Sequence, residues 1–260
     1  MAVRASGARP RNLYVSSNVV AVAPAMTAAQ EQSWNGLLDV GDTLRDGWCL
    51  VGGQLVHLHC WERGASPTRP TDDGDAVVDV RGTTAGLHRF TAELVRLGFQ
   101  SSGETMEGHQ HRWVRDAAQI DVLVPTRTAH FTQRRGVTGG TTLETPGAQQ
   151  ALDRTELVEV TVAGRTGTVP RPRLFGAIVA KAAAYTTNDP GRDRHMADFV
   201  VLTTLAGRRD YSAETITYRD REYLGHICAM TNNTRHIWTG IQGGEDGLQR
   251  LRAAIAVNKH

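Results

Sequence analysis

Three aspartates lie in or beside stretches whose other residues are typical of buried β-strands. Asp73 and Asp75 run into Ala76-Val77-Val78, and Asp121 lies inside the apolar run 118–124. Residues two apart on a strand point to the same face, so Asp73 and Asp75 would be presented side by side. Close carboxylates repel one another and are costly to bury, and a hard divalent cation with oxygen ligands offsets that cost. The three acids therefore predict a sheet that holds a cation.

Two simpler interpretations of these acids stay open from spacing alone. The run Asp72-Asp73-Gly74-Asp75 is also typical of a solvated turn, and Asp121 could pair with an arginine such as Arg112.

A glycine pair, Gly52-Gly53, lies about twenty residues ahead of the acids, where an expected strand gives way to an expected helix. Such a junction leaves backbone N–H groups at the positive end of the helix, where they can bind phosphate oxygens. The alternative is an ordinary turn that needs positive φ. Beside the acids, the pair favours a site for a triphosphate and its metal.

The periodicity of the chain predicts an α+β fold: a small mixed β-sheet with flanking helices, followed by a mainly helical half. Leu87, Phe90, Leu94 and Leu97, for example, are spaced as on one face of a helix. The glycine-rich residues 126–150 predict a long mobile connection. The expected helices are 27–46, 54–61, 83–97, 173–186, 193–206, 219–231 and 244–257, and the expected strands are 48–51, 75–80, 110–115, 118–124, 156–163 and 166–169.

Three regions are expected from this pattern. Residues 1–26 predict a disordered N-terminal extension, which only faintly resembles a signal peptide. Residues 27–145 predict the sheet-containing core domain, and residues 146–260 a mainly helical domain that completes a cleft.

The composition limits the classes of partner and the cellular compartment that we expect. The chain of 260 residues has 29 basic and 27 acidic residues, a net charge of +2, so it gives no global signal for binding a polyanion. Its three cysteines are too few for a disulfide framework, and no apolar run reaches the ~20 residues of a membrane span. We expect a soluble cytoplasmic protein without a membrane partner.

Two charged residues of the second half interrupt apolar helical stripes. Lys181 follows Leu174 and Ile178, and Asp198 precedes Val201. Opposite charges on facing stripes favour a cleft. The alternatives are a lysine whose stem packs on the core while its ammonium reaches solvent, and an i,i+4 pair of Asp198 with Arg194.

Taken together, these residues resemble a known family. Gly52-Gly53, Arg69-x-Thr71-x-Asp73-x-Asp75 and Asp121 are similar to the signature of polymerase-beta-type nucleotidyltransferases, most closely the bacterial toxin-antitoxin and abortive-infection enzymes of the AbiEii type. The resemblance continues through 170–174, Lys181 and Arg194-His195-x-x-Asp198, and covers roughly residues 30–206. One departure is Gly74, where the family usually has a bulky aliphatic residue.

The resemblance implies a role for each matching position. Magnesium would be held by Asp73, Asp75 and Asp121. A nucleoside triphosphate would contact Gly52, Gly53, Arg69, Thr71, Lys181 and Arg194. The catalytic set would be Asp73, Asp75, Asp121, Lys181 and Asp198.

The implied activity is magnesium-dependent transfer of a nucleoside monophosphate to an acceptor hydroxyl, above all at the acceptor end of transfer RNA, by a toxin with a cognate antitoxin. Rival acceptors are a small molecule such as an aminoglycoside, or a protein. A rival from another class is a non-catalytic nucleotide- or RNA-binding protein. Five arginines could form a local basic rim that binds RNA phosphates, or could be scattered surface charges. They are Arg134, Arg135, Arg165, Arg171 and Arg173.

Overall fold

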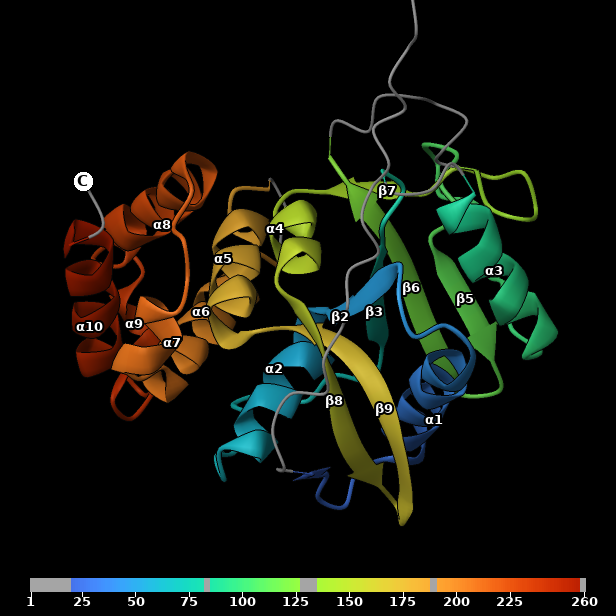
Figure 1. Ribbon diagram of the computed structural model, residues 1–260, viewed down its shortest axis with the longest axis horizontal. Helices are drawn as coiled ribbons and strands as arrows, with labels where there is room; N and C mark the ends of the chain where they lie inside the picture. Colours follow the sequence, from blue (N-terminus) through green and yellow to red (C-terminus); the bar gives the residue numbers. More distant parts are fainter. Residues whose placement is uncertain (1–19, 82–84, 127–134, 188–190, 258–260) are drawn as a thin grey trace, which may run out of the picture.

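The computed structural model describes residues 20–81, 85–126, 135–187 and 191–257. A sheet of mixed direction forms the centre of the first half (Figure 1). Its strands follow the order β2-β3-β6-β5-β4, with β7 pairing with β6 in addition. The strands are β2 (Trp48–Val51), β3 (Gly74–Val78), β4 (Gln100–Ser101), β5 (Arg112–Arg115), β6 (Ala118–Pro125) and β7 (Leu143–Thr145).

One face of this sheet is covered by α1 (Ala28–Thr43) and α3 (Gly86–Arg96). Trp48 on β2 packs against Phe90 of α3, with ring centroids 5.5 Å apart. On the opposite face, α4 (Ala148–Asp153) contributes Ala148, Ala151 and Leu152 to a small buried cluster with strand residues. The second face is only partly covered, which leaves room for a cleft.

A hairpin of β8 (Thr155–Val162) and β9 (Arg165–Pro172) lies beside α1, and β1 (Ala21–Val22) pairs in parallel with β8. Gly41 of α1 is in direct contact with the hairpin: a Cβ at this position would stand 2.2 Å from the carbonyl oxygen of Thr168. A glycine is therefore needed where the helix meets β9.

The second half is a group of helices beside the sheet (Figure 1). They are α5 (Leu174–Ala184), α6 (Asp193–Leu205), α7 (Arg208–Ser212), α8 (Tyr218–Met230), α9 (Arg235–Trp238) and α10 (Gly244–Val257), while α2 (Gly52–Glu62) follows β2 in the first half. No helix within the described ranges is both long and apolar enough to cross a membrane.

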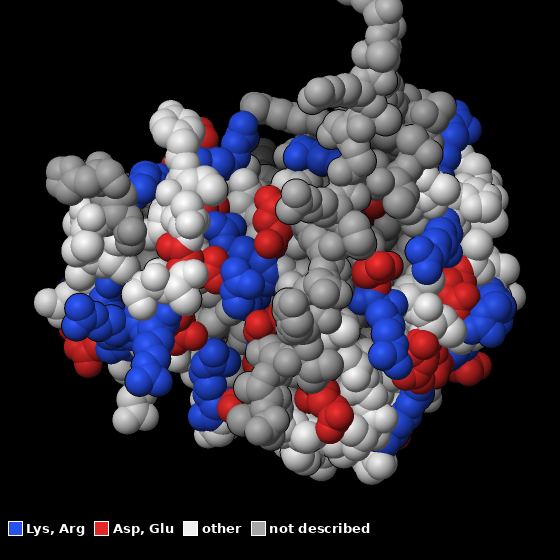
Figure 2. All heavy atoms as spheres, viewed as in Figure 1, with Lys and Arg blue, Asp and Glu red and all other residues white. Residues whose placement is uncertain are grey.

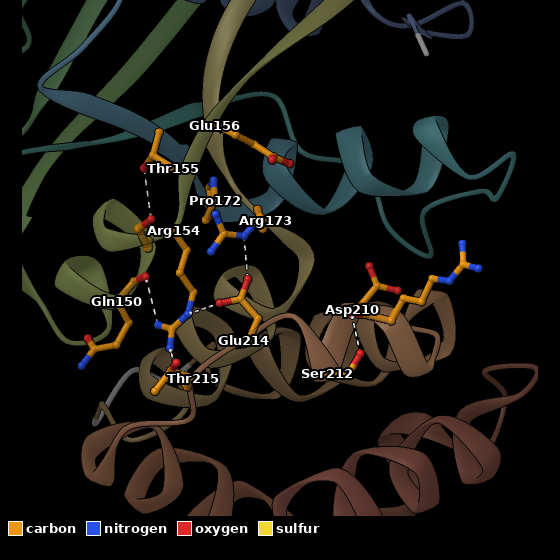
Figure 3. A network of polar contacts seen from close by, with 12 residues as sticks. Gln150, Arg154, Thr155, Glu156, Pro172, Arg173, Asp210, Ser212, Glu214 and Thr215 are labelled. Carbon is orange, nitrogen blue, oxygen red and sulfur yellow. Dashed lines mark hydrogen bonds and ion pairs between the residues drawn. The ribbon is translucent and has the colours of Figure 1, made fainter. Parts of the chain in front are cut away.

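A buried arginine ties these helices to α4. Arg154 is 6% exposed and donates hydrogen bonds to the carboxylates of Glu214 and Asp220, at 3.0 and 2.6 Å. Arg173 donates to the other oxygen of Glu214 at 2.6 Å, as Figure 3 shows. Removing one partner of such a buried ion pair would leave a charge uncompensated, so this network fixes the helical half against the hairpin end.

The expected α+β class is confirmed, with shifts of a few residues at the ends of elements. Two expectations were wrong in part. Within the proposed N-terminal extension, Ala21–Val22 form a strand and Ala21 is fully buried, whereas residues 1–19 lie outside the described residues. Within the proposed mobile connection, β7 and α4 are ordered, and 127–134 lie outside the described residues. The boundary at 145/146 stays a prediction.

The contact of Gly41 with β9 predicts opposite effects for one substitution at two helical glycines. Gly41→Ala should lower the free energy of unfolding by about 1–3 kcal/mol, because the added methyl meets backbone and not a flexible side chain. Gly225→Ala on α8 should raise it by about 0.5–1 kcal/mol, because a Cβ there meets nothing within 4 Å and alanine favours the helix. Urea unfolding measures both; equal effects would contradict the close packing of α1 on β9.

Candidate active site

The three predicted acids meet at the open face of the sheet. Asp75 on β3 and Asp121 on β6 are register partners in a parallel pair, and Asp73 directly precedes β3. One carboxylate oxygen from each of the three lies within 4.8 Å of the others. Asp73 also accepts a hydrogen bond from Thr71 Oγ1 at 2.7 Å. The interpretation of 72–75 as a solvated turn is therefore wrong for Asp73 and Asp75.

Both glycines of the pair lie directly against this cluster. Gly52 has φ +69°, and a Cβ on it would stand 1.6 Å from Oδ2 of Asp75. A Cβ on Gly53 would stand 2.7 Å from Oγ1 of Thr71. The pair opens α2, whose first turn receives no side-chain cap. The glycine pair is therefore a turn that needs positive φ, which was the simpler interpretation. It also brings uncapped backbone amides to the acids, as expected for a phosphate site.

Gly74, which departs from the family pattern, has a packing reason. It is buried, pairs in register with Ile120 and forms no bulge in β3. A Cβ here would stand 2.9 Å from Cδ1 of Leu37 on α1. Leu37 therefore fills the space that a bulky residue at position 74 would take, and the two flanking acids keep their orientation.

For Asp121, membership of the acid cluster and pairing with Arg112 were alternatives in the sequence analysis, and the structure shows both. Asp121 belongs to the acid cluster, and it also accepts two hydrogen bonds from Arg112 of the neighbouring strand, from Nε at 3.0 Å and from a terminal nitrogen at 2.9 Å. A two-point contact of this kind fixes the plane of the carboxylate.

Lys181 and Asp198 come together across α5 and α6, with Arg69 from the loop before β3. Lys181 Nζ lies 2.8 Å from Asp198 Oδ2, and Arg69 donates to both oxygens of Asp198 at 3.1 and 2.7 Å. Although burial alone would raise the pKa of Asp198, Lys181 and Arg69 outweigh it and lower that pKa below its ordinary value. Asp198 is thus a permanent anion that holds two cations.

A cleft of about 450 Å³ contains most of the predicted site. Its walls are the open face of the sheet, the segment 143–148, and residues of α5 and α6. The predicted residues on its walls are Gly52, Gly53, Arg69, Thr71, Asp73, Asp75, Asp121, Lys181 and Arg194. Asp198 is 2% exposed and is not part of the wall, so it lies behind Arg69 and Lys181.

Sequence reasoning assigned no role in this cleft to several residues of its wall. They include His111, which directly precedes β5, Glu144 on β7, and Thr187 and His195 at the α5–α6 end. Arg112, which the sequence analysis named as a possible partner of Asp121, also lies on this wall, and the register of β5 with β6 places it opposite that acid. Glu144 is brought in by β7, a three-residue strand that carries no period signal of its own.

The acid cluster fits a divalent cation. Burial, together with the neighbouring carboxylates of Asp73 and Asp121, raises the pKa of Asp75 to about 7 against the opposing charges of Lys181 and Arg194. Three carboxylates crowded in this way supply the hard oxygen ligands that a divalent cation such as magnesium prefers, and the cation's charge would offset their repulsion. Asp73, Asp75 and Asp121 would hold the ion.

Comparisons with known proteins give two similar structures. An antigenic nucleotidyltransferase-like protein from Paracoccidioides brasiliensis shares 13% identity with a TM-score of 0.49, and the match covers 82% of this chain and 93% of that one. The antibiotic-resistance factor ANT(2'')-Ia shares 16% identity with a TM-score of 0.42, over 81% and 100% of the two chains. Both TM-scores lie below 0.5, so the resemblance is one of general architecture at most. No protein-family model and no curated protein matches the chain.

The crowding of the acids predicts a pH-dependent gain of stability on removing one charge. A carboxyl whose pKa rises from 3.8 to about 7 on folding destabilises the protein increasingly from pH 4 upward, and the effect levels off above pH 7. In EDTA, Asp75→Asn should therefore raise the free energy of unfolding by about 1–3 kcal/mol at pH 8, and by less at pH 5. Urea titrations at both pH values measure the difference.

The exposed acid Asp116, substituted as Asp116→Asn, provides the matched control and should change little at either pH. Adding magnesium at pH 8 should stabilise the wild type and leave Asp75→Asn nearly unaffected. A gain that is equal at pH 5 and pH 8 would contradict the assignment of the effect to the Asp75 charge.

Proposed function

We propose that this protein is a magnesium-dependent nucleotidyltransferase that moves a nucleoside monophosphate from a nucleoside triphosphate to an acceptor hydroxyl. The observation that carries the proposal is the meeting, in one cleft, of three carboxylates with two glycines that have no room for a side chain. Arg69 and Lys181, from distant parts of the chain, lie on the same cleft wall.

Each group of residues has a distinct task. The uncapped amides at Gly52 and Gly53 suit the phosphate oxygens of the substrate. Lys181, Arg69 and Arg194 supply positive charge on the cleft wall. When bound, magnesium would neutralise charge on the triphosphate and on the attacking and leaving oxygens. Catalysis then consists mainly of positioning and charge compensation.

The reaction balances as a displacement at phosphorus. The acceptor oxygen forms a bond to the α-phosphorus, the bond from that phosphorus to the bridging oxygen breaks, and pyrophosphate leaves with the electron pair. Asp121 would accept the proton of the hydroxyl, and its two bonds to Arg112 hold the carboxylate plane for that contact.

Transfer RNA as acceptor, and the role of a toxin with an antitoxin partner, rest on the family resemblance. Three of the arginines that could have formed a basic rim give this acceptor little support, because each pairs with acidic side chains. Arg165 pairs with Asp39 and Asp42, and Arg171 with Glu62 and Glu156. Arg173 likewise pairs with Glu214, and Arg134 lies outside the described residues.

The visible surface is in keeping with this pairing. On the face shown in Figure 2, basic and acidic side chains are interspersed and form no broad basic field outside the grey parts. This face therefore gives no support to binding of an RNA acceptor through many phosphates.

A small cationic acceptor is the second candidate, and Glu144 is the observation that favours it. Glu144 lies on the cleft wall and adds a fourth carboxylate to those of the acid cluster. Amino groups of a small acceptor bind well between carboxylates. An acceptor of this kind would need no basic rim.

Label transfer tests the activity and separates the acceptors. The protein is incubated with magnesium and each α-labelled nucleoside triphosphate, in the presence of total transfer RNA or of an aminoglycoside mixture. Asp73→Ala should lower the rate on the order of 100-fold or more, because a metal ligand is lost. Asp72→Ala is the matched control, since the Asp72 side chain is exposed and is not part of the cleft wall.

Label on RNA would support the toxin-like acceptor, and label on the aminoglycoside would support the second candidate. Label on the protein itself would indicate a protein acceptor. Triphosphate binding without transfer to any acceptor, or equal rates for Asp72→Ala and Asp73→Ala, would contradict the proposed activity and favour a binding protein.

A further inference from the structure

The loop that carries the first metal ligand is held from behind by a glutamine. Gln30, at the third position of α1, donates a hydrogen bond from Nε2 to the carbonyl oxygen of Thr71 at 3.1 Å. The two residues are 41 positions apart. Gln30 is half-buried and is not part of the cleft wall, so its contact with the site passes through Thr71.

Thr71 is enclosed on several sides. Its hydroxyl donates to Asp73 at 2.7 Å, and its side chain lies within 2.8 Å of where a Cβ on Gly53 would be. Its carbonyl is held by Gln30. On the other side of Pro70, the carbonyl oxygen of Arg69 lies 2.8 Å from Nε2 of His57. The backbone on both sides of Pro70 is thus fixed, and with it the hydroxyl that orients Asp73.

The same glutamine also caps α1. Its Oε1 accepts from the backbone N–H of Thr27 at 3.0 Å, and its own N–H donates to Thr27 Oγ1 at 3.2 Å. A capping box of this kind accepts glutamate or glutamine at the third position. Only the amide can also donate to Thr71, since a carboxylate would place an acceptor against a carbonyl. The helix cap alone does not explain why a glutamine stands here.

We propose that Gln30 is a positioning residue for the metal site, acting through Thr71 on Asp73. This inference rests on the proposed function. Groups that orient metal ligands from outside the coordination sphere commonly change metal affinity about 10–100-fold when they are removed. Gln30 acts one residue further out, so a smaller change, on the order of 3–10-fold, is expected.

Gln30→Glu separates the two roles of the residue. It keeps the acceptor that caps Thr27 and loses the donor to Thr71. Gln32→Glu is the matched control: it adds the same charge two residues along and keeps the acceptor Oε1, which binds the N–H of Ala117 at 2.9 Å. The uncharged variant Gln30→Met removes the donor without adding charge, and serves should Gln30→Glu fold poorly.

Two measurements on the full chain decide the role. The first is Mn²⁺ binding followed by electron paramagnetic resonance, with Asp73→Ala as the variant that should lose the site. The second is hydrogen exchange of peptides covering 64–75 in the metal-free protein. Gln30→Glu should raise the Mn²⁺ dissociation constant about 3–10-fold and speed exchange at 69–73, with little change in the unfolding midpoint. Gln32→Glu should do neither.

Equal Mn²⁺ affinity and equal exchange in Gln30→Glu and wild type would overturn the positioning role. So would equal changes in Gln30→Glu and Gln32→Glu, because added charge would then account for them. If Mn²⁺ binding to the wild type is absent, or is the same in Asp73→Ala, the proposed metal-dependent function is overturned instead. Hydrogen exchange of the metal-free loop then still decides whether Gln30 holds Thr71.

Discussion

The repulsion among three carboxylates is the constraint on which the rest of this structure depends. Asp73, Asp75 and Asp121 are held within 4.8 Å of one another, and the pKa of Asp75 rises to about 7 as a result of burial and of its neighbours. Such a cluster persists only where the surrounding fold holds each side chain in place. The missing side chains at Gly52 and Gly53, the two-point contact from Arg112 and the bond from Thr71 serve this purpose.

Positive charge is distributed around the cluster in two ways. Arg112 is bound directly to one of the acids, whereas Lys181 and Arg69 are held by a different acid, Asp198, behind the cleft wall. Asp198 thereby keeps both cations beside the acid cluster and prevents them from pairing with its carboxylates. A phosphate that entered the cleft would meet cations whose positions are already fixed, which lowers the cost of ordering them on binding.

The sequence alone predicted the acids, the glycine pair and the two charges of the helical half, because each breaks a local pattern: acids in an apolar strand, or charges on an apolar helical face. Of the partners of these residues it named one that the structure shows, Arg112 for Asp121, and only as an open alternative. The pairing of Arg69 with Asp198 joins residues 129 positions apart, and the contact of Gly74 with Leu37 depends on how α1 crosses the sheet. Short elements such as β1 and β7 were missed because two or three residues carry no detectable period.

The placement of β1 has a consequence for how the protein is made. Ala21 pairs with Val160 and is fully buried, so one of the first described segments of the chain cannot be paired before the hairpin has formed. The wall of the cleft forms later still, because its two cations, Lys181 and Arg69, are held by Asp198 on α6. Contacts of such long sequence separation form late. A nascent chain therefore cannot complete the wall of this cleft before α6 has left the ribosome, because Lys181 and Arg69 have no Asp198 to hold them until then.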